Sequence, residues 1–296
     1  MQISVIVPTH NRRVLLLRLL DSLLRQTLCA DDYEVIVVCD GATDGTAEQV
    51  RTLCREHSRL HLVEQPQRGP AVARNAGARI AQGRYLAFTD DDCIVSREWL
   101  EKLIESLKES GIVGSMGRTT TIVSEITPLT HQMVSDHSSI FVMATCNAAY
   151  RRDAFEQLRG FDEGFQFPHN EDADFAWRLE SLGKVSYAPD ALVVHPPRPE
   201  TFTNKALWVR FFESEFLLFS KNPNAYRKHR SPSPWSTIYW KVFVVSQFQS
   251  AKSALRYIFF RFRPDYFAIA IALTIARWWI LILLFPRFLR AARRVR

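Results

Sequence analysis

The sequence predicts an α/β fold with a mostly parallel sheet flanked by helices, followed by a helical, membrane-associated extension at the C-terminus. Three observations carry this prediction. Short apolar runs alternate with amphipathic segments of helical period through the first two thirds of the chain, which is typical of parallel sheets with helices on both faces. Polar residues directly follow several of these runs, at the edge where such sheets bind ligands. The last third turns basic and aromatic.

The composition narrows the class of protein. The chain has 296 residues, of which 47% are hydrophobic, and a net charge of +7. The length allows one large domain and an appendage, and the charge fits an anionic membrane surface, a phosphate-rich ligand or nucleic acid. The five cysteines form no C-x-x-C pair, so we expect reduced thiols in a cytosolic setting. An apolar strand begins at Ile3, so we expect no signal peptide and a catalytic part on the cytoplasmic side.

The elements of the first part of the chain follow from hydrophobic periodicity. Apolar runs predict strands, and leucines or alanines at helical spacing predict the helices between them. In order, we expect strands at Ile3–Val7, Tyr33–Val38, Leu60–Val63 and Arg84–Thr89, with helices over the leucines of 15–23, up to about His57, and at Gly69–Ala81. Thr9, Asp40 and Asp90 each follow one of these strands, so we expect them to meet in one cleft.

An acidic triplet, Asp90-Asp91-Asp92, follows the fourth strand directly. If the extended geometry continues, Asp90 and Asp92 point to the same side, where two like charges raise each other's pKa. A divalent cation such as Mg²⁺ or Mn²⁺ relieves that repulsion and keeps positions open for substrate phosphates. The alternative is a polar turn in which Asp91 or Asp92 caps the next helix. The triplet alone leaves both interpretations open.

The middle third is less regular. Ser96 is expected to cap a helix whose apolar face runs from Trp99 to Leu107. We expect strands at Ile112–Val123, Thr145–Tyr150 and Val185–Val194, and an acceptor-facing insertion at Ser124–Ser139. A helix near residue 171 carries Glu171, Asp172 and Asp174 in its first turn. The helix dipole favours acids there, although three are more than a cap needs.

The final third contains two apolar segments, Trp235–Phe248 and Phe267–Phe285. The second has nineteen residues, apolar except for Thr274 and Arg277. That length just spans a hydrocarbon core, but an arginine near the middle is costly in a lone spanning helix. A helix lying in the membrane interface fits equally well. A third possibility is that these helices cover the domain's own core.

Several motifs in order resemble the family 2 inverting glycosyltransferases of the GT-A type, a Rossmann-like fold. The resemblance covers roughly Ile3 to His195. The matching motifs are the family's first strand and turn at Val5-Ile6-Val7-Pro8-Thr9-His10-Asn11-Arg12, its nucleotide loop at Val38–Thr46, its Gly69–Tyr85 segment, its D-x-D at Asp90–Asp92 and its E-D pair at Glu171-Asp172. The sequence departs from the pattern at Cys39, where aspartate is usual, and at Ala42. The implied domains are residues 1–200, with a nucleotide-binding half at 1–95 and an acceptor half at 96–200, and a helical region at 201–296.

The resemblance implies a role for each matching position. Asp172 is the implied general base, and the implied cofactor is Mn²⁺ or Mg²⁺. The implied metal ligands are Asp92, Asp90 and His195, although a histidine that simply ends a strand is an equally good interpretation of the last. The implied nucleotide-sugar contacts are Pro8, Thr9, Asn11, Arg12, Asp40, Arg74, Asp90 and Asp91. Asn147, Glu171 and Trp177 are implied to face the sugar or the acceptor.

The implied function is metal-assisted transfer of a sugar, with inversion, from a nucleoside diphosphate, with UDP expected first, to a hydroxyl of a glycan or lipid-linked acceptor. The expected location is the cytoplasmic face of the plasma or inner membrane. Two alternatives remain: a membrane-bound nucleotide-sugar-binding protein without turnover, and a haloacid-dehalogenase-like phosphatase. A nucleic-acid partner is not expected, because the basic residues gather beside apolar helices. A dinucleotide enzyme would carry G-x-G-x-x-G after the first strand.

Overall fold

The computed structural model describes all residues except 132, 247–253, 256, 260–261 and 295–296. The chain forms two compact units. The first comprises residues 1–122 and 132–196, and the second comprises 123–131 and 197–296. This division groups residues by contact and does not test the expected nucleotide and acceptor halves, which remain proposals.

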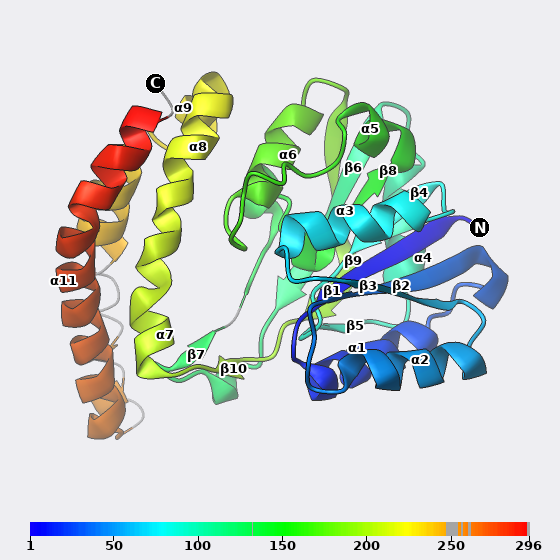
Figure 1. The fold of residues 1–296 in the computed structure, drawn as a ribbon, viewed down its shortest axis with the longest axis horizontal. Helices are drawn as coiled ribbons and strands as arrows, with labels where there is room; N and C mark the ends of the chain where they lie inside the picture. Colours follow the sequence, from blue (N-terminus) through cyan, green and yellow to red (C-terminus); the bar gives the residue numbers. More distant parts are fainter. Residues whose placement is uncertain (132, 247–253, 256, 260–261, 295–296) are drawn as a thin grey trace. The chain divides into compact units, whose positions relative to one another are not determined.

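The first unit is built around an eight-stranded sheet with strand order β3-β2-β1-β4-β8-β6-β9-β5 (Figure 1). The pairs β1–β2, β2–β3, β1–β4 and β6–β9 are parallel, and β8 and β5 run antiparallel to their neighbours. The strands are β1 Ile3–Thr9, β2 Tyr33–Asp40, β3 Leu60–Gln65, β4 Tyr85–Phe88, β5 Ile94–Val95, β6 Ile112–Thr120, β8 Ala148–Arg151 and β9 Lys184–Val194. The sheet is therefore mostly parallel, as predicted.

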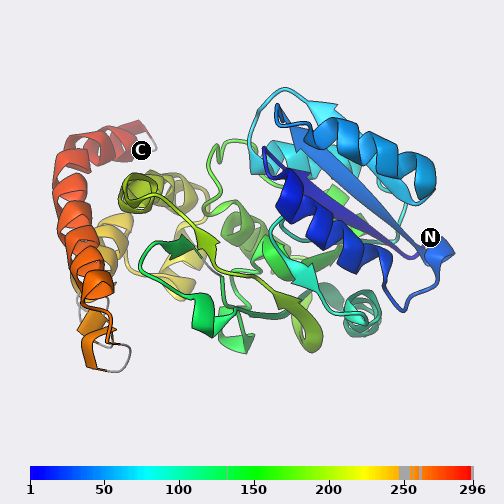
Figure 2. The same cartoon turned by 90° about the horizontal axis from the view of Figure 1, so that it is seen from below.

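Helices cover both faces of this sheet because its strands are apolar on both sides (Figures 1 and 2). Along β1, Val5 and Val7 join the buried core that includes the leucines of α1, whereas Ile6 faces α3 at Gly77. Alternate residues of one strand thus serve two helical layers. The helices of this unit are α1 Arg13–Leu24, α2 Thr46–Glu56, α3 Pro70–Ile80, α4 Trp99–Leu107, α5 Arg152–Gln157 and α6 Glu171–Leu179.

Several element boundaries differ from the sequence-based expectation. Strand β6 ends at Thr120, and residues 145–147 form a 3-10 turn before β8. The expected cap by Ser96 is wrong: α4 begins after Glu98, and only the Ser96 carbonyl takes part, accepting from the Trp99 amide at 3.2 Å. The insertion after β6 contains two 3-10 turns and the short strand β7, Thr130–His131.

In its described residues the second unit is helical apart from β7, which pairs antiparallel with β10, Arg198–Pro199. Its helices include α7 Phe202–Leu207, η5 Trp208–Glu213, α8 Ser214–Lys221, α9 Pro223–His229, η6 Ser236–Ser246 and α11 Pro264–Arg294. The expected apolar segment Trp235–Phe248 corresponds to η6, and residues 247 and 248 lie outside the described part of the chain. Helix α11 bends in its last part, drawn red in Figure 2, and contains Pro286.

Candidate active site

The acidic triplet lies in a turn and not in a continued strand. Strand β4 ends at Phe88, and the Cys93 amide donates to the Asp90 carbonyl at 3.1 Å. The expectation that Asp90 and Asp92 share one side through extended geometry is therefore wrong. The next helix begins at Trp99, so neither Asp91 nor Asp92 caps it. The three carboxylates instead contact three different basic side chains, Arg12, Arg74 and His195.

Asp91 ties the triplet to the end of β1. Its Oδ2 accepts from the Thr9 hydroxyl at 2.8 Å, and its Oδ1 accepts from Nη1 of Arg12 at 2.8 Å. Burial raises the pKa of Asp91 even though Arg12 opposes the shift. For Arg12, burial alone would lower the pKa, but Asp91 and Asp92 outweigh it and the pKa is raised. This contact fixes the position of the turn, and Arg12 remains partly exposed.

Arg74 of α3 joins Asp90 to the start of α6. Its Nη2 donates to Asp90 Oδ1 at 2.9 Å and its Nη1 donates to Glu171 Oε1 at 2.8 Å. Burial would lower the pKa of Arg74, but the two carboxylates outweigh it and the pKa is raised. Burial would likewise raise the pKa of Asp90, yet Arg74 and His195 lower it. Sequence positions 74, 90 and 171 are thus brought together by one guanidinium.

Glu171 and Asp172 differ in accessibility. Glu171 is buried, and burial, followed by the charge of Asp172, raises its pKa to about 7. Asp172 is only half-buried, and its Oδ1 accepts from the Ala173 amide at 2.8 Å. Asp172 also acts electrostatically on Arg74, which places it in the neighbourhood of Asp90. Of the two acids, Asp172 is the one with exposed surface for a substrate.

Asp92 and His195 meet at the end of β9. Asp92 Oδ1 lies 3.3 Å from His195 Nε2, and both side chains are buried. The His195 amide donates to the Thr120 carbonyl at 2.8 Å. One oxygen, one thiol sulfur and one ring nitrogen of Asp92, Cys93 and His195 all lie within 4.8 Å of one another. These donor atoms fit a divalent cation, whereas Asp90 is not part of this group.

The Asp40 carboxylate holds the loop that leads into α3. Its Oδ1 accepts from Gln65 Nε2 and from the Arg68 amide, and its Oδ2 accepts from the Gly69 amide, each at 2.8 Å. Gly69 has φ of +93°, a conformation that favours glycine. The bonds to Gln65 and to the loop amides were not foreseen from the sequence. The expected contact of Asp40 with a nucleotide base remains a proposal.

Asn11 organises the neighbouring loop. Its backbone has φ of +53°, and its side-chain oxygen accepts from the Thr43 amide at 2.7 Å. Pro8 lies in β1, paired with Val38. These contacts position the loops around the end of β1 without testing whether either residue touches a nucleotide.

Asn147 and Trp177 lie in the core. Asn147 is 0% exposed; its amide donates to the carbonyls of Arg118 and Ala191, and its oxygen accepts from the Trp99 indole. Trp177 is buried, and its indole donates to the Phe141 carbonyl at 3.0 Å. With both amide hydrogens engaged, Asn147 joins strands and helix α4. These bonds give Asn147 a positioning role, and the sugar or acceptor contacts expected of Asn147 and Trp177 stay predictions.

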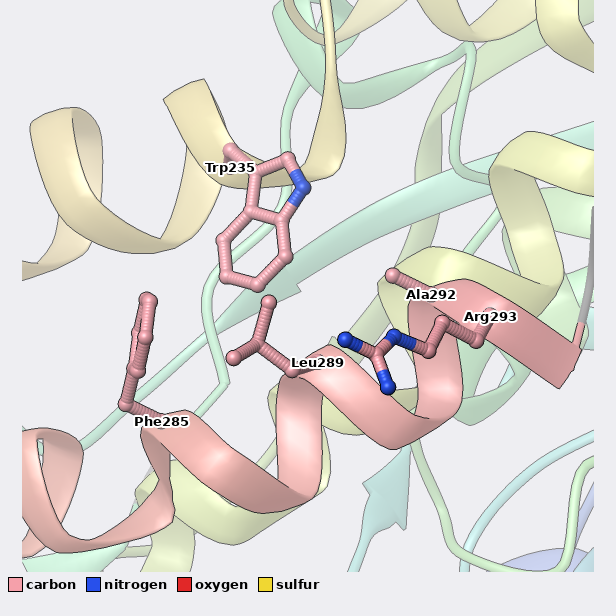
Figure 3. Close-up of a pocket in the computed structure, with 5 residues that line it drawn as sticks. All are labelled: Trp235, Phe285, Leu289, Ala292 and Arg293. Atoms are coloured by element: carbon pink, nitrogen blue, oxygen red, sulfur yellow. The ribbon is translucent and has the colours of Figure 1, made fainter.

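A pocket lies elsewhere, in the second unit, and contains none of the expected site residues. Figure 3 shows Trp235 facing α11, which contributes the other lining residues. They are Phe285, Leu289, Ala292 and Arg293. The candidate active site is therefore defined by the side-chain cluster at the carboxyl ends of β1, β2, β4 and β9.

Comparison with known proteins identifies the family of this chain. Residues 4–159 match the family model described as glycosyl transferase family 2. A Haloferax volcanii protein, glycosyltransferase AglE, is 30% identical over 207 residues, covering 67% of this chain and 67% of that protein. The uncharacterised glycosyltransferase EpsJ of Bacillus subtilis is 29% identical over 219 residues, covering 68% of this chain but 62% of its own length. The match therefore leaves over a third of EpsJ uncovered.

Two solved structures share the fold. Mannosyltransferase PcManGT of Pyrobaculum calidifontis, solved with GDP-Man and Mn²⁺, has a TM-score of 0.61 at 22% identity over 94% of this chain and 87% of that chain. TarS residues 1–349 of S. aureus, solved with UDP-GlcNAc, have a TM-score of 0.61 at 19% identity, covering 97% and 92%. Both likenesses establish the GT-A-like architecture. Because the family model covers more than half of the sequence, this chain belongs to glycosyl transferase family 2.

Proposed function

We propose that this chain transfers a sugar, with inversion, from a nucleoside diphosphate donor to a hydroxyl of a glycan or lipid-linked acceptor. The observation that carries the proposal is the buried Arg74, which holds Asp90 of the triplet and Glu171 beside Asp172. It brings a cluster suited to a cation and a diphosphate next to an accessible carboxylate. Because the chain belongs to glycosyl transferase family 2, we set aside the alternative of a haloacid-dehalogenase-like phosphatase.

In the proposed reaction the chain supplies a proton acceptor on one side and a charge-stabilising cluster on the other. Asp172 takes the proton of the acceptor hydroxyl as the hydroxyl oxygen attacks the sugar carbon that is bonded to the diphosphate. The bond between that carbon and the diphosphate breaks. Asp92 and His195, with Asp90 nearby, would hold Mn²⁺ or Mg²⁺, which when bound supplies Lewis-acid stabilisation of the leaving diphosphate. Arg12, beside Asp91, is partly exposed and adds positive charge at the same edge. Because this is a single displacement, the configuration at the attacked sugar carbon is inverted.

The proposed donor follows from the acidic cluster, which suits a cation and a diphosphate, and from the ligands of similar solved structures. TarS and PcManGT were solved with UDP-GlcNAc and GDP-Man respectively, so a nucleotide sugar is the class to test. A UDP-sugar is our first candidate. The loops held by Asp40 and Asn11 form the proposed nucleotide site, where Cys39 and Ala42 replace the residues usual in the family.

The test is a screen of UDP- and GDP-sugars with the purified chain and Mn²⁺. We expect thermal stabilisation by one donor, and slow release of nucleoside diphosphate that chelation of the cation abolishes. The Asp172→Asn variant should keep the stabilisation and lose the release. Stabilisation without any turnover would favour the nucleotide-sugar-binding alternative. If no nucleotide sugar stabilises or is hydrolysed, the proposal is wrong.

We also propose that α11 docks on a membrane. It is the one helix in the described part of the chain that is long and apolar enough to cross a bilayer. Arg277, the costly residue in the sequence, lies on the packed face: its guanidinium donates to the Lys205 carbonyl at 3.1 and 3.3 Å. Leu273, Leu281 and Phe288 are buried on the same face as Arg277, at spacings of eight and seven residues.

The opposite face of α11 is apolar and exposed. Ile275, Trp279 and Ile282 repeat at spacings of four and three and are 49%, 63% and 51% exposed. The elements packed on the other face carry charged residues, including Lys205 and Glu213, the latter bonded to Arg287. A spanning helix would bring those charges into hydrocarbon at a cost of several kcal/mol. We therefore propose that α11 lies in the interface, on the cytoplasmic face, with arginines near anionic headgroups.

A further inference from the structure

We propose that Cys93 is a third protein ligand at the cation site, and that Asp92, Cys93 and His195 together bind Zn²⁺-like, thiophilic cations more tightly than Mn²⁺ or Mg²⁺. This inference rests on the proposed cation site of Asp92 and His195, and it adds a soft ligand and a metal preference. Asp90 lies outside the group because its carboxylate is held by Arg74.

The sheet fixes Cys93 and His195 opposite each other. Strand β5 begins immediately after Cys93 and pairs antiparallel with the last residues of β9, with Ile94 opposite Val194 and Val95 opposite Val193. One step further in the same register places Cys93 across from His195. Residues directly opposite on antiparallel strands have their side chains close enough to interact. The arrangement is therefore built by backbone pairing and not by a mobile loop.

The three side chains are buried together. Asp92, Cys93 and His195 are 6%, 0% and 3% exposed. Their donor atoms lie within 4.8 Å of one another, and the Asp92–His195 contact is 3.3 Å. With metal bonds of 2.0–2.3 Å, ligand atoms in a tetrahedral site lie roughly 3.3–3.8 Å apart. The longest of these separations must therefore shorten by roughly 1–1.5 Å to close the site, by the same bond lengths.

The chemistry of this donor set differs from that of an all-oxygen site. Mg²⁺ prefers oxygen ligands, whereas Zn²⁺, Co²⁺ and Cd²⁺ accept sulfur and imidazole. When a cation binds, its bond to sulfur forms as the S–H bond breaks and the proton leaves to solvent, with no change in oxidation state. Three protein ligands leave a fourth position for a phosphate oxygen of the donor.

The competing interpretation is that Cys93 only fills space. Its thiol belongs to the buried core cluster of the first unit, and a small apolar residue would serve equally well there. The two interpretations differ in what the thiol does when a cation is added. A space-filling thiol gives no metal–sulfur bond.

The experiment uses the full-length chain, stripped of metal and titrated with Co²⁺ alone, without nucleotide. We expect a sulfur-to-cobalt charge-transfer band in the near ultraviolet that saturates at one Co²⁺ per chain and disappears when Zn²⁺ is added. Cys93→Ser should abolish the band and lower Zn²⁺ affinity by more than the roughly 10–100-fold that losing an outer-shell partner costs. Mn²⁺ affinity, measured by electron paramagnetic resonance, should change much less.

Cys146→Ser is the matched control, because Cys146 is also buried, with its sulfur 3.8 Å from the Thr119 hydroxyl. It should keep the band. Metal-free thermal unfolding checks that both variants fold, and Cys93→Ala provides a second variant. No band in the wild type, or an unchanged band in Cys93→Ser, would overturn the inference. A normal band in a chain that transfers no sugar would instead contradict only the proposed reaction.

Discussion

At the scale of single residues, the site depends on a few buried charges that are satisfied by one another. Arg74 is 3% exposed and binds Asp90 and Glu171. Such a group is costly to bury and strongly destabilising when one partner is removed. Arg74 therefore acts as a positioning residue: it sets where Asp90 and the start of α6 lie, and through α6 it sets Asp172.

The first prediction concerns Asp172. Asp172→Asn keeps the shape of the side chain but cannot accept the acceptor's proton. We expect kcat to fall by roughly 10²–10⁴-fold, the range typical of a general base, with donor affinity nearly unchanged. Turnover of a labelled nucleotide sugar and calorimetric donor binding measure the two quantities. Asp21→Asn, at a solvent-exposed residue of α1 that pairs with Arg25, is the control and should turn over like the wild type. Normal turnover by Asp172→Asn would remove Asp172 from the mechanism.

The second prediction concerns Arg74. Arg74→Lys keeps one charge but loses the fork that reaches two carboxylates. We expect the free energy of unfolding to fall by about 3–5 kcal/mol, as when a buried ion pair is broken. Urea unfolding measures the change. Arg79→Lys, on the same helix with 63% of its side chain exposed, should change stability little. Equal stability of the two variants would contradict the assigned role of Arg74.

The third prediction is a pH dependence. Burial, with the charge of Asp172, raises the pKa of Glu171 from 4.5 to about 7. The folded chain then binds a proton at Glu171 that the unfolded chain has released. This contribution to stability is full below about pH 4.5 and is lost as pH rises through about 7. Comparing urea midpoints of wild type and Glu171→Gln from pH 5 to 8 isolates it. A wild-type-minus-variant difference that does not fall over this range would contradict the prediction.

At the scale of elements, hydrophobic periodicity was a good guide because each strand and helix buries its own apolar face. It located β1, β2 and α3 to within a few residues. It was wrong where the outcome depended on tertiary partners. The turn at Asp90–Asp92 is shaped by Arg12, Arg74 and His195, which are far away in sequence. Likewise, spacing alone revealed neither the core bonds of Asn147 nor the pairing of β5 with β9.

The sequence also could not predict which face of α11 packs against the rest of its unit. It showed Arg277 inside an apolar segment, but not which group would accept the hydrogen bonds of its guanidinium. The Lys205 carbonyl accepts from its guanidinium, and this directs the arginine away from the exposed apolar face. A single distant acceptor thus decides which face of the helix is available to a membrane.

The fourth prediction belongs to this face. Trp279→Glu should lower partitioning onto anionic phospholipid vesicles by about tenfold or more, because one buried aromatic contributes roughly 1.5–3 kcal/mol. Vesicle flotation measures it. Val14→Glu, at a residue 61% exposed on α1, is a matched control and should bind vesicles like the wild type. Equal binding of all three proteins would contradict docking through α11.

At the scale of the whole molecule, each unit has its own core. The second unit buries Phe212, Phe216, Ile238, Leu281 and Phe288 together. Deleting α11 would expose that core as well as remove the proposed docking face. Surface substitutions such as Trp279→Glu therefore separate membrane affinity from folding better than truncation does.

The pairing of β7 with β10 has a consequence for cleavage of the chain. Residues 123–131 belong to the second unit, although the residues before and after them belong to the first. Within this segment, Thr130 pairs with Pro199 and His131 pairs with Arg198. The backbone therefore passes between the units at three places. A protease that nicks the connection near residue 197 would cut only one of them. We expect the two fragments to co-purify under native conditions and to separate only in denaturant.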